Sequence, residues 1–285
     1  MKGIRKAIIP AAGFGTRHLP ITKAVPKEML PVLSKPAIDY VVSECIAAGI
    51  NEICIVISRS KAAIPDYLDH KPELEAVLTK AGKRDLLDVV NPFSGKADFY
   101  FIRQPEMKGT GNAVRICKEF IAGEDFAVLF PDDIIDSAAP VIGQLITAYE
   151  TTGTSIVGVQ KMPPEQAKLY GIVVPGVTKG RYSVVKGFIE KPSVEFMPSE
   201  LTSLGRFVLT ADVFDYIDRV KAVGGEIRLP DAIDLMSKTT GVYAYEFEGK
   251  RYDMGSIEGF LEANIAFAKK DKHLLKIITD ELNRG

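Results

Sequence analysis

Short apolar runs alternate with amphipathic stretches along the chain, and this alternation constrains the fold more than any other feature of the sequence. The runs are rich in β-branched and aromatic residues at consecutive positions, which is typical of strands buried on both faces. They cover residues 6–10, 52–58, 98–104, 126–130 and 154–161. Strands that alternate with helices form βαβ units, so we expect a mainly parallel sheet with helices on both faces.

The stretches between these runs carry helix start and stop signals. Residues 36–49 open with a proline and close with a glycine, and residues 111–123 also close with a glycine. Both stretches are therefore predicted to be helical. Residues 60–95 indicate a helical excursion before the third strand.

The second half of the chain has a different pattern. Residues 171–210 indicate strands joined by turns, which predicts an antiparallel or mixed sheet over the open end of the first one. Beyond Ser256, apolar residues at helical spacing predict two amphipathic helices. Since no internal repeat or linker marks a boundary, we predict one domain over residues 1–255, followed by C-terminal helices over residues 256–285.

The charge of the chain is local rather than global. The composition of 46% hydrophobic and 26% charged residues is that of a globular protein, and the net charge of -1 favours neither nucleic acid nor an anionic membrane as a partner. Six cations nevertheless precede the first carboxylate, Glu28; they are Lys2, Arg5, Lys6, Arg17, Lys23 and Lys27. We therefore expect a small anionic ligand near this end of the chain.

The cysteines and the hydrophobic segments indicate a cytoplasmic protein. Cys45, Cys54 and Cys117 lie in apolar segments without a C-x-x-C spacing, as expected of buried, reduced thiols. The N-terminal apolar run is short for a secretory signal, and no segment approaches the ~18 apolar residues needed to cross a bilayer.

The glycines after the first predicted strand fit neither of two common phosphate-binding loops. A dinucleotide fingerprint would have a third glycine where His18 stands, and a Walker loop would need G-K-[ST]. The small residues of this loop would still let backbone groups approach a flat ligand, with Arg17 and Lys27 bracing phosphates, as a nucleoside triphosphate requires. A glycine turn with solvated cations remains the alternative.

The segment AAGFGTRHLPITKAVPKEMLP resembles the signature of the sugar-phosphate nucleotidylyltransferases. The segments RQPEMKGTGNAV, FPDDI, LYGIV, FIEKP, LGRFVL, GEIRLPDAIDLM and YDMGS follow in that family's order, so the resemblance spans residues 5 to about 265. It implies a Rossmann-like three-layer α/β/α nucleotidyltransferase fold with a mixed, mainly parallel central sheet and a smaller antiparallel sheet on the sugar side. It also implies a homodimer or homotetramer, with residues 256–285 as a contact between subunits.

Within that family, the sequence resembles the branch that uses UTP. The resemblance then implies transfer of a uridylyl group from UTP to glucose 1-phosphate, with Mg²⁺ as the cofactor. It assigns the nucleotide to Ala11, Ala12, Gly13, Gly15, Thr16, Arg17, Lys27, Gln104, Gly109 and Gly111, of which Gln104 reads the base. It assigns the sugar phosphate, bound by residues 165–210, to Gly171, Glu190, Lys191 and Gly205, and the metal to Asp132 and Asp253. The implied catalytic residues are Arg17, Lys27, Asp132 and Lys191.

General chemistry agrees with these roles. Two carboxylates suffice for Mg²⁺, which keeps waters and substrate phosphates among its ligands. A phosphate monoester has a second pKa of about 6, so the nucleophile is largely dianionic at neutral pH and needs no general base. This accounts for the absence of any cluster among His18, His70 and His273.

Each motif also has an ordinary structural interpretation. Asp132 and Asp253 lie in segments typical of turns, and Lys191 precedes a proline that favours extended backbone. Three positions depart from the family pattern, namely Asn112, Pro230 and Met254, and they leave the choice of sugar open. The alternatives are a thymidylyltransferase that uses the same sugar phosphate, or a nucleotide-binding regulatory homologue with weak or no catalysis.

Overall fold

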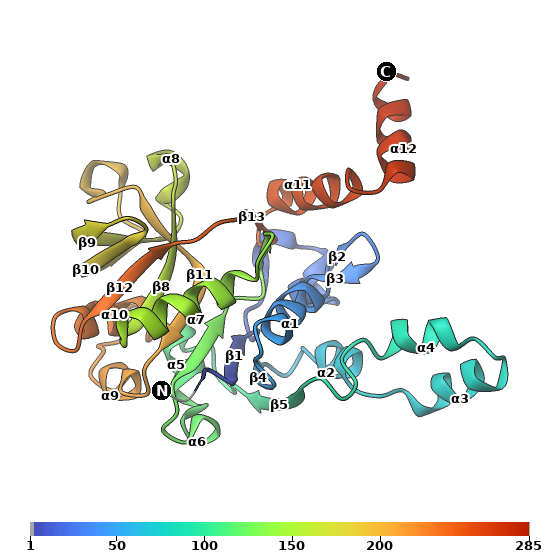
Figure 1. The fold of residues 1–285 in the computed structure, drawn as a ribbon, viewed down its shortest axis with the longest axis horizontal. Helices are drawn as coiled ribbons and strands as arrows, with labels where there is room; N and C mark the ends of the chain where they lie inside the picture. The colour runs from blue at the N-terminus through green and yellow to red at the C-terminus, as the bar shows by residue number, and fades with distance from the viewer. Residues whose placement is uncertain (1–2, 285) are drawn as a thin grey trace.

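The computed structural model describes residues 3–284. Lys2, one of the six cations counted above, and the outermost residues of the predicted domain ranges lie outside this part of the chain. Within it, a nine-stranded sheet forms the centre of the molecule (Figure 1). Its strands, in spatial order, are β5 (Asp98–Arg103), β4 (Glu52–Ile57), β1 (Lys6–Pro10), β6 (Phe126–Leu129), β11 (Leu201–Leu209), β8 (Ser155–Lys161), β12 (Val242–Glu246), β10 (Tyr182–Glu190) and β9 (Gly171–Lys179).

The sheet has a parallel part and a part that is largely antiparallel. The four strands β5, β4, β1 and β6 are parallel, as the βαβ alternation predicts. β11 then pairs antiparallel with both β6 and β8. The expected antiparallel strands β9 and β10 pair with each other and continue the central sheet through β12, which is itself parallel to β8. The mixed α/β fold predicted from the sequence is therefore confirmed.

Helices cover both faces of this sheet. In chain order, the helices of the described residues are α1 (Ala37–Ala47), α2 (Ala63–Leu68), α3 (Pro72–Lys80), α4 (Arg84–Val90), α5 (Gly109–Arg115), α6 (Lys118–Ile121), α7 (Val141–Thr152), α8 (Pro164–Ala167), α9 (Val213–Ile217), α10 (Leu229–Ser237), α11 (Ile257–Ala268) and α12 (Lys272–Leu282). Short 3₁₀ turns are η1 (Thr16–His18), η2 (Ile21–Lys23), η3 (Lys27–Met29) and η4 (Val194–Phe196). Two small sheets pair β2 (Pro31–Val32) with β3 (Lys35–Pro36), and β7 (Asp133–Asp136) with β13 (Lys250–Asp253).

The alternation of side chains along the central strands creates two cores. Ile8 packs on the face covered by α5, α6, α9 and α10, whereas its neighbours Ala7 and Ile9 pack on the face covered by α1 and α7. Both sets are buried, so the middle of β1 is apolar at consecutive positions and separates two hydrophobic layers. This explains why the strand runs were continuous in the sequence, and it gives the three layers that the resemblance implied.

The elements differ from the sequence predictions mainly at helix boundaries. The five predicted strands are present, each to within one residue at either end. The helix expected over residues 111–123 is divided into α5 and α6, because the backbone tightens at Cys117, whose amide donates to the Val114 carbonyl at 3.0 Å.

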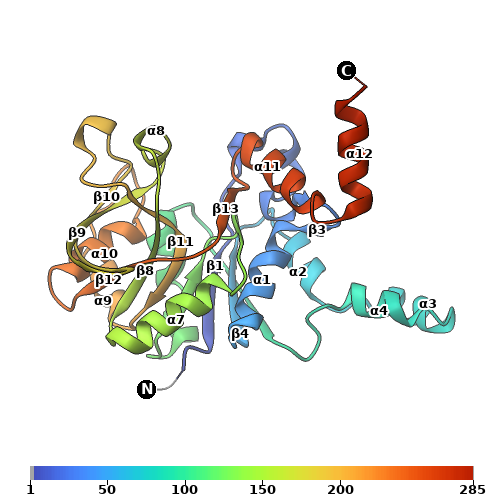
Figure 2. The same cartoon turned by 45° about the horizontal axis from the view of Figure 1, so that its top comes forward.

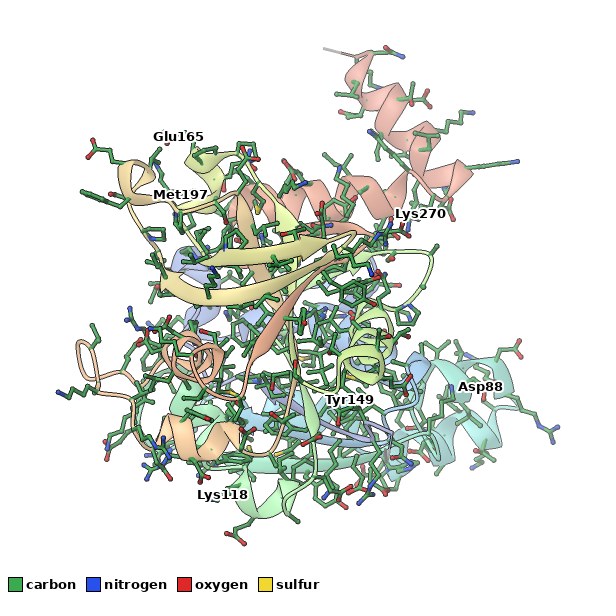
Figure 3. All side chains as sticks on the ribbon, turned by 60° about the vertical axis from the view of Figure 1, so that its left-hand side comes forward. Asp88, Lys118, Tyr149, Glu165, Met197 and Lys270 are labelled. Carbon is green, nitrogen blue, oxygen red and sulfur yellow. The ribbon has the colours of Figure 1, made fainter. Side chains whose placement is uncertain are left out.

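Two helical segments project from the same side of the molecule. One contains α3 and α4, and the other is the C-terminal helix α12 (Figures 1 and 2). Figure 3 shows the same two projections from another direction: the segment that carries Asp88 and the helix that follows Lys270 both extend beyond the body of the molecule. None of the helices in the described part of the chain is long and apolar enough to span a membrane.

Candidate active site

A cavity of about 790 Å³ opens at the carboxyl ends of the parallel strands, where they meet the antiparallel part of the sheet. The segments after β1, β5 and β6 form one side of it, and β9, β10 and β11 contribute to the other. Five basic and five acidic side chains line it: Arg17, Lys27, Lys191, Arg228 and Arg251, with Asp132, Asp133, Glu190, Glu226 and Asp253. Cations and carboxylates at one site suit an anionic ligand that arrives with a metal.

Most of the residues predicted for the nucleotide, the sugar phosphate and the metal line this cavity. They are Ala12, Gly13, Arg17, Lys27, Gln104, Gly109, Asp132, Gly171, Glu190, Lys191, Gly205 and Asp253. Four predicted nucleotide residues do not line it, namely Ala11, Gly15, Thr16 and Gly111. Ala11 is buried, and its amide extends the β1–β4 pairing by donating to Val56 at 2.8 Å.

An ion pair between Lys27 and Asp132 joins the glycine loop to the end of β6. The Lys27 Nζ lies 2.5 Å from the Asp132 Oδ2. Burial opposes the ionisation of Asp132, but the Lys27 ammonium outweighs it and lowers the pKa of Asp132 to about 2. Burial also lowers the pKa of Lys27, but Asp132 and Glu28 more than offset it, so that pKa is raised. Both groups are therefore charged at neutral pH.

The glycines of the loop make room for the Lys27 side chain. A Cβ at Gly15 would lie 3.1 Å from the Cβ of Lys27, and Gly15 has a left-handed backbone with φ of 70°. Gly13 faces the other end of the same side chain, because a Cβ there would lie 4.0 Å from the Lys27 Cε. Gly15 therefore contributes to the site indirectly, because its lack of a side chain allows Lys27 to pack against the loop.

The second predicted metal carboxylate, Asp253, is held by several groups. Its Oδ2 accepts a hydrogen bond from the Tyr170 hydroxyl at 2.6 Å, and its Oδ1 accepts one from the Gly255 amide at 2.8 Å. Arg17 and Arg251 each place a guanidinium nitrogen 3.6 Å from Oδ2.

The backbone joins the segments that carry the two carboxylates. The amide of Met254 donates to the carbonyl of Asp132 at 2.8 Å. Asp132 and Asp253, far apart in the sequence, are thereby brought to one wall of the cavity.

Asp133 and Arg251, which also line the cavity, form a largely buried pair beside these two carboxylates. The Arg251 Nε donates to the Asp133 Oδ1 at 2.6 Å. Burial and the neighbouring carboxylates Asp132 and Asp253 raise the pKa of Asp133 to about 6, although Arg251 opposes this shift. A buried arginine, Arg206, donates to the Asp133 carbonyl at 2.7 Å and to the Phe130 carbonyl at 3.1 Å. Arg206 thus fixes the backbone on both sides of Asp132.

Two glycines on the predicted sugar side allow close approaches. A Cβ at Gly171 would collide with the Phe188 ring and would lie 3.0 Å from the Glu190 Oε2. A Cβ at Gly205 would overlap the Asp133 carboxylate, and Gly205 has a φ of 61°. A side chain at either position would therefore displace an acidic group of the site.

The backbone of Lys191 is not extended, although the proline that follows it favours that conformation. Its φ is 48°, in the left-handed region that non-glycine residues rarely adopt, at a cost of about 1–2 kcal/mol. Its amide donates to the Tyr170 carbonyl at 3.1 Å, which anchors the turn. The exposed side chain lies over the cavity, with its Nζ 3.6 Å from the Glu190 Oε1. Burial raises the pKa of Glu190, and the charge of Lys191 partly offsets that shift.

The predicted base-reading residue is oriented by the glycine that follows it. Gln104 is 4% exposed, and its Nε2 donates to the Gly109 carbonyl at 3.3 Å. A Cβ at Gly109 would lie 2.5 Å from the Ile227 carbonyl oxygen, which also accepts from the Gly111 amide at 2.8 Å. Gly109 and Gly111 therefore allow the segment before α10 to close against α5.

The cationic N-terminal segment is not one anion site. Of its described cations, Arg17 and Lys27 line the cavity, whereas Arg5 and Lys6 pair with Glu124 at the opposite end of β1. Lys23 is exposed and does not line the cavity. Of the described cations in this segment, only Arg17 and Lys27 are therefore placed to meet the small anion expected near this end of the chain, because strand direction separates them from Arg5 and Lys6.

Sequence reasoning missed several residues of the cavity. Tyr170 lies within the segment LYGIV and Arg251 directly precedes YDMGS, but their partners come from distant segments. Glu226 and Arg228 belong to GEIRLP, whose charged residues gave the only available signal. Within residues 3–284, no group of three or more histidine, cysteine or acidic side chains is arranged to hold a metal without further ligands.

The chain is similar to known proteins over nearly its whole length. The nucleotidyl transferase family profile matches residues 6–270. The UTP–glucose-1-phosphate uridylyltransferase of Bacillus subtilis strain 168 is 49% identical over 275 residues, which are 96% of this chain and 94% of that protein. A crystal structure of a UDP-glucose pyrophosphorylase complexed with UDP-glucose matches with a TM-score of 0.85 and 37% identity, covering 94% of this chain and all of the other. A UDP-glucose pyrophosphorylase from Acinetobacter baumannii matches with a TM-score of 0.91 and 34% identity, over 99% and 100% of the two chains.

Proposed function

The chain belongs to the nucleotidyl transferase family, and we propose that it transfers the uridylyl group of UTP to glucose 1-phosphate, giving UDP-glucose and pyrophosphate. The observation that carries this function is the 49% identity, over 96% of the chain, to a UTP–glucose-1-phosphate uridylyltransferase. The family resemblance noted in the sequence is thus confirmed. The charged pair of Lys27 and Asp132 in an open cavity favours a catalyst over a regulatory homologue.

The reaction requires positioning and charge neutralisation more than proton transfer. An oxygen of the sugar phosphate attacks the α-phosphorus of UTP, and the bond from that phosphorus to the bridging oxygen breaks in line to release pyrophosphate. The attacking phosphate is already largely dianionic near pH 7, since its second pKa is about 6. Accordingly, we assign no residue as a general base.

Three cations of the cavity serve the two phosphate groups. Lys27 and Arg17 lie on the nucleotide side and are assigned to the triphosphate, where charge grows on the departing oxygens. Lys191 lies on the opposite side, beside Glu190, and is assigned to the phosphate of the sugar. The left-handed backbone at Lys191 supports this role, because strained conformations persist where a side chain must be held in one place.

The two carboxylates fit a divalent metal. Asp132 and Asp253 line the same cavity and offer oxygen ligands, and the low pKa of Asp132 keeps it ionised. Mg²⁺ prefers such a set of few protein carboxylates completed by phosphates and waters, and when bound it neutralises charge on the phosphate oxygens. Tyr170 and the Gly255 amide orient Asp253 for this purpose.

We further propose that the chain acts in the cytoplasm. The three cysteines are free and buried, and the sulfurs of Cys54 and Cys117 lie 3.7 Å apart without a disulfide. Reduced thiols this close are compatible with a reducing compartment.

Removal of the metal or of its ligand should abolish most activity while the fold persists. EDTA should abolish the activity of the wild-type enzyme. Asp132→Asn should lower kcat by roughly 100-fold or more, which is the usual effect of removing one group that stabilises charge in the transition state. Pyrophosphate release and thermal unfolding measure the two effects. Asp136→Asn, which alters a surface pair with Lys270, is the matched control. Full activity of Asp132→Asn, or of a chelated sample, would remove the metal assignment.

The role of Lys191 predicts a difference between the two substrates. Lys191→Ala should raise the KM for glucose 1-phosphate far more than that for UTP, because a charge-assisted contact to phosphate contributes about 1.5–3 kcal/mol. Steady-state kinetics with each substrate varied in turn measures the difference. Lys168→Ala, which removes an exposed lysine near the same edge, is the control. Unchanged sugar-phosphate kinetics in Lys191→Ala would show that the residue only forms a turn.

The position of Gln104 predicts a ranking of nucleotides. Uracil presents an N3–H donor beside an O4 acceptor, which one carboxamide can meet, and the bond to Gly109 opposes rotation of that amide to suit cytosine. UTP should be the best substrate and TTP a measurable second, since one methyl changes selectivity by only about 10 to 200-fold. CTP and GTP should be poor. Pyrophosphate release across nucleotides and sugar 1-phosphates tests this ranking, which Gln104→Ala should flatten. Equal kcat/KM for UTP and CTP would contradict it.

The C-terminal helices predict a homodimer or homotetramer. α12 has no buried residue, and Leu275, Ile277 and Leu282 are exposed on it, which leaves an apolar face for another subunit. Truncation after Ala268 should therefore reduce the particle mass measured by light scattering. A monomeric wild-type protein at assay concentration would rule out this assembly.

A further inference from the structure

A second buried ion pair lies beside the active-site pair and has no role in the reaction described above. The Nζ of Lys61 lies 2.6 Å from the Oε2 of Glu28, and the side chains are 3% and 0% exposed. Neither residue lines the cavity. Glu28 directly follows Lys27 in the turn η3, and Lys61 precedes α2, which packs on that turn.

Stability alone gives a poor account of this pair. Two charges taken out of water lose about as much hydration energy as their attraction returns, so an apolar pair of similar volume is often equally stable. The other oxygen of Glu28, Oε1, is buried without a hydrogen-bond partner, as is the Ser58 Oγ. A carboxylate that is only half satisfied adds a further cost. Such a group is best explained by its effect on a neighbour.

That neighbour is Lys27. Its stem is seated against Gly13 and Gly15, its Nζ contacts Asp132, and the following residue is anchored by Lys61. Once Lys27 turns toward a triphosphate, the contact to Asp132 no longer fixes it. The Glu28–Lys61 pair remains, because it does not touch the cavity.

We propose that Glu28 and Lys61 are positioning residues for the nucleotide: their buried pair fixes the η3 turn that carries Lys27, so that Lys27 presents its ammonium to the triphosphate. This inference rests on the proposed function, since it requires a nucleoside triphosphate in the cavity. It predicts that loss of the pair affects UTP and spares glucose 1-phosphate, whose predicted contacts lie on β9, β10 and β11.

The test compares Lys61→Met with Lys6→Met. Lys6 is also a buried lysine, paired with Glu124 at 2.9 Å, but it lies at the end of β1 away from the cavity. Lys61→Met should weaken equilibrium binding of UTP by about tenfold and raise its KM similarly, the scale of weakening one charge-assisted contact. The KM for glucose 1-phosphate should change less than about twofold, a small effect beside that loss. Lys6→Met should leave both constants unchanged.

Two further variants separate positioning from stability. Glu28→Gln keeps the size of the side chain and loses its charge, so it should weaken UTP binding even if Lys61→Met fails to fold. The double variant Glu28→Met/Lys61→Met removes the pair together, so its thermal stability should approach that of the wild type while UTP binding stays weak. Recovery of UTP binding in the double variant, or equal losses for both substrates, would overturn the proposal. Failure of the wild type to form UDP-glucose would instead refute the proposed function, since UTP binding is measured without turnover.

Discussion

The ion pair between Lys27 and Asp132 is the interaction on which the rest of the site depends. It joins the loop after β1 to the end of β6, two neighbouring parallel strands whose carboxyl ends meet at this edge. Neighbouring groups hold both members of the pair in place. The glycine loop leaves space for the aliphatic part of Lys27, and Arg206 holds the backbone around Asp132. The carbonyl of Asp132 in turn holds the segment of Asp253. A displacement of either charged group would therefore reach the glycine loop and both predicted metal ligands.

The change of strand direction at β11 gives the cavity its two sides. Parallel strands bring loops with nucleotide chemistry to one edge, because their carboxyl ends coincide. β11 runs antiparallel to β6 and carries Gly205 into the same cavity from mid-strand. The predicted sugar side is thus formed mainly within strands, where Gly171 and Gly205 leave space for neighbouring side chains. The two parts of the sheet therefore present backbone to the cavity in different ways.

The sequence was sufficient for the five predicted strands, and most of the site residues predicted from it line the cavity, for identifiable reasons. Continuous apolar runs have no competing interpretation once helices separate them, and residues after such strands must lie at one edge. It could not show that Arg5 and Lys6 lie at the far end of β1, because adjacent cations diverge once a strand separates them. Nor could it show that Tyr170 meets Asp253 or that Arg251 meets Asp133, since each contact joins segments that are far apart in the sequence. A residue before proline prefers extended backbone, but Lys191 is left-handed. The sequence could not show this, because the conformation is held by a contact to a distant residue, Tyr170.

Most of the charged side chains that line the cavity pair with one another. Lys27 faces Asp132, Arg17 lies near Asp253, Lys191 lies near Glu190, and Arg251 faces Asp133. A triphosphate that draws Lys27 and Arg17 away would leave Asp132 and Asp253 without counter-charges inside a poorly solvated site, which is costly. A divalent cation that accompanies the nucleotide would restore neutrality at those same two carboxylates. In the proposed reaction, such an exchange of partners would couple nucleotide binding to metal binding through charge balance. It also explains why the predicted metal ligands and the predicted phosphate ligands are found paired with one another.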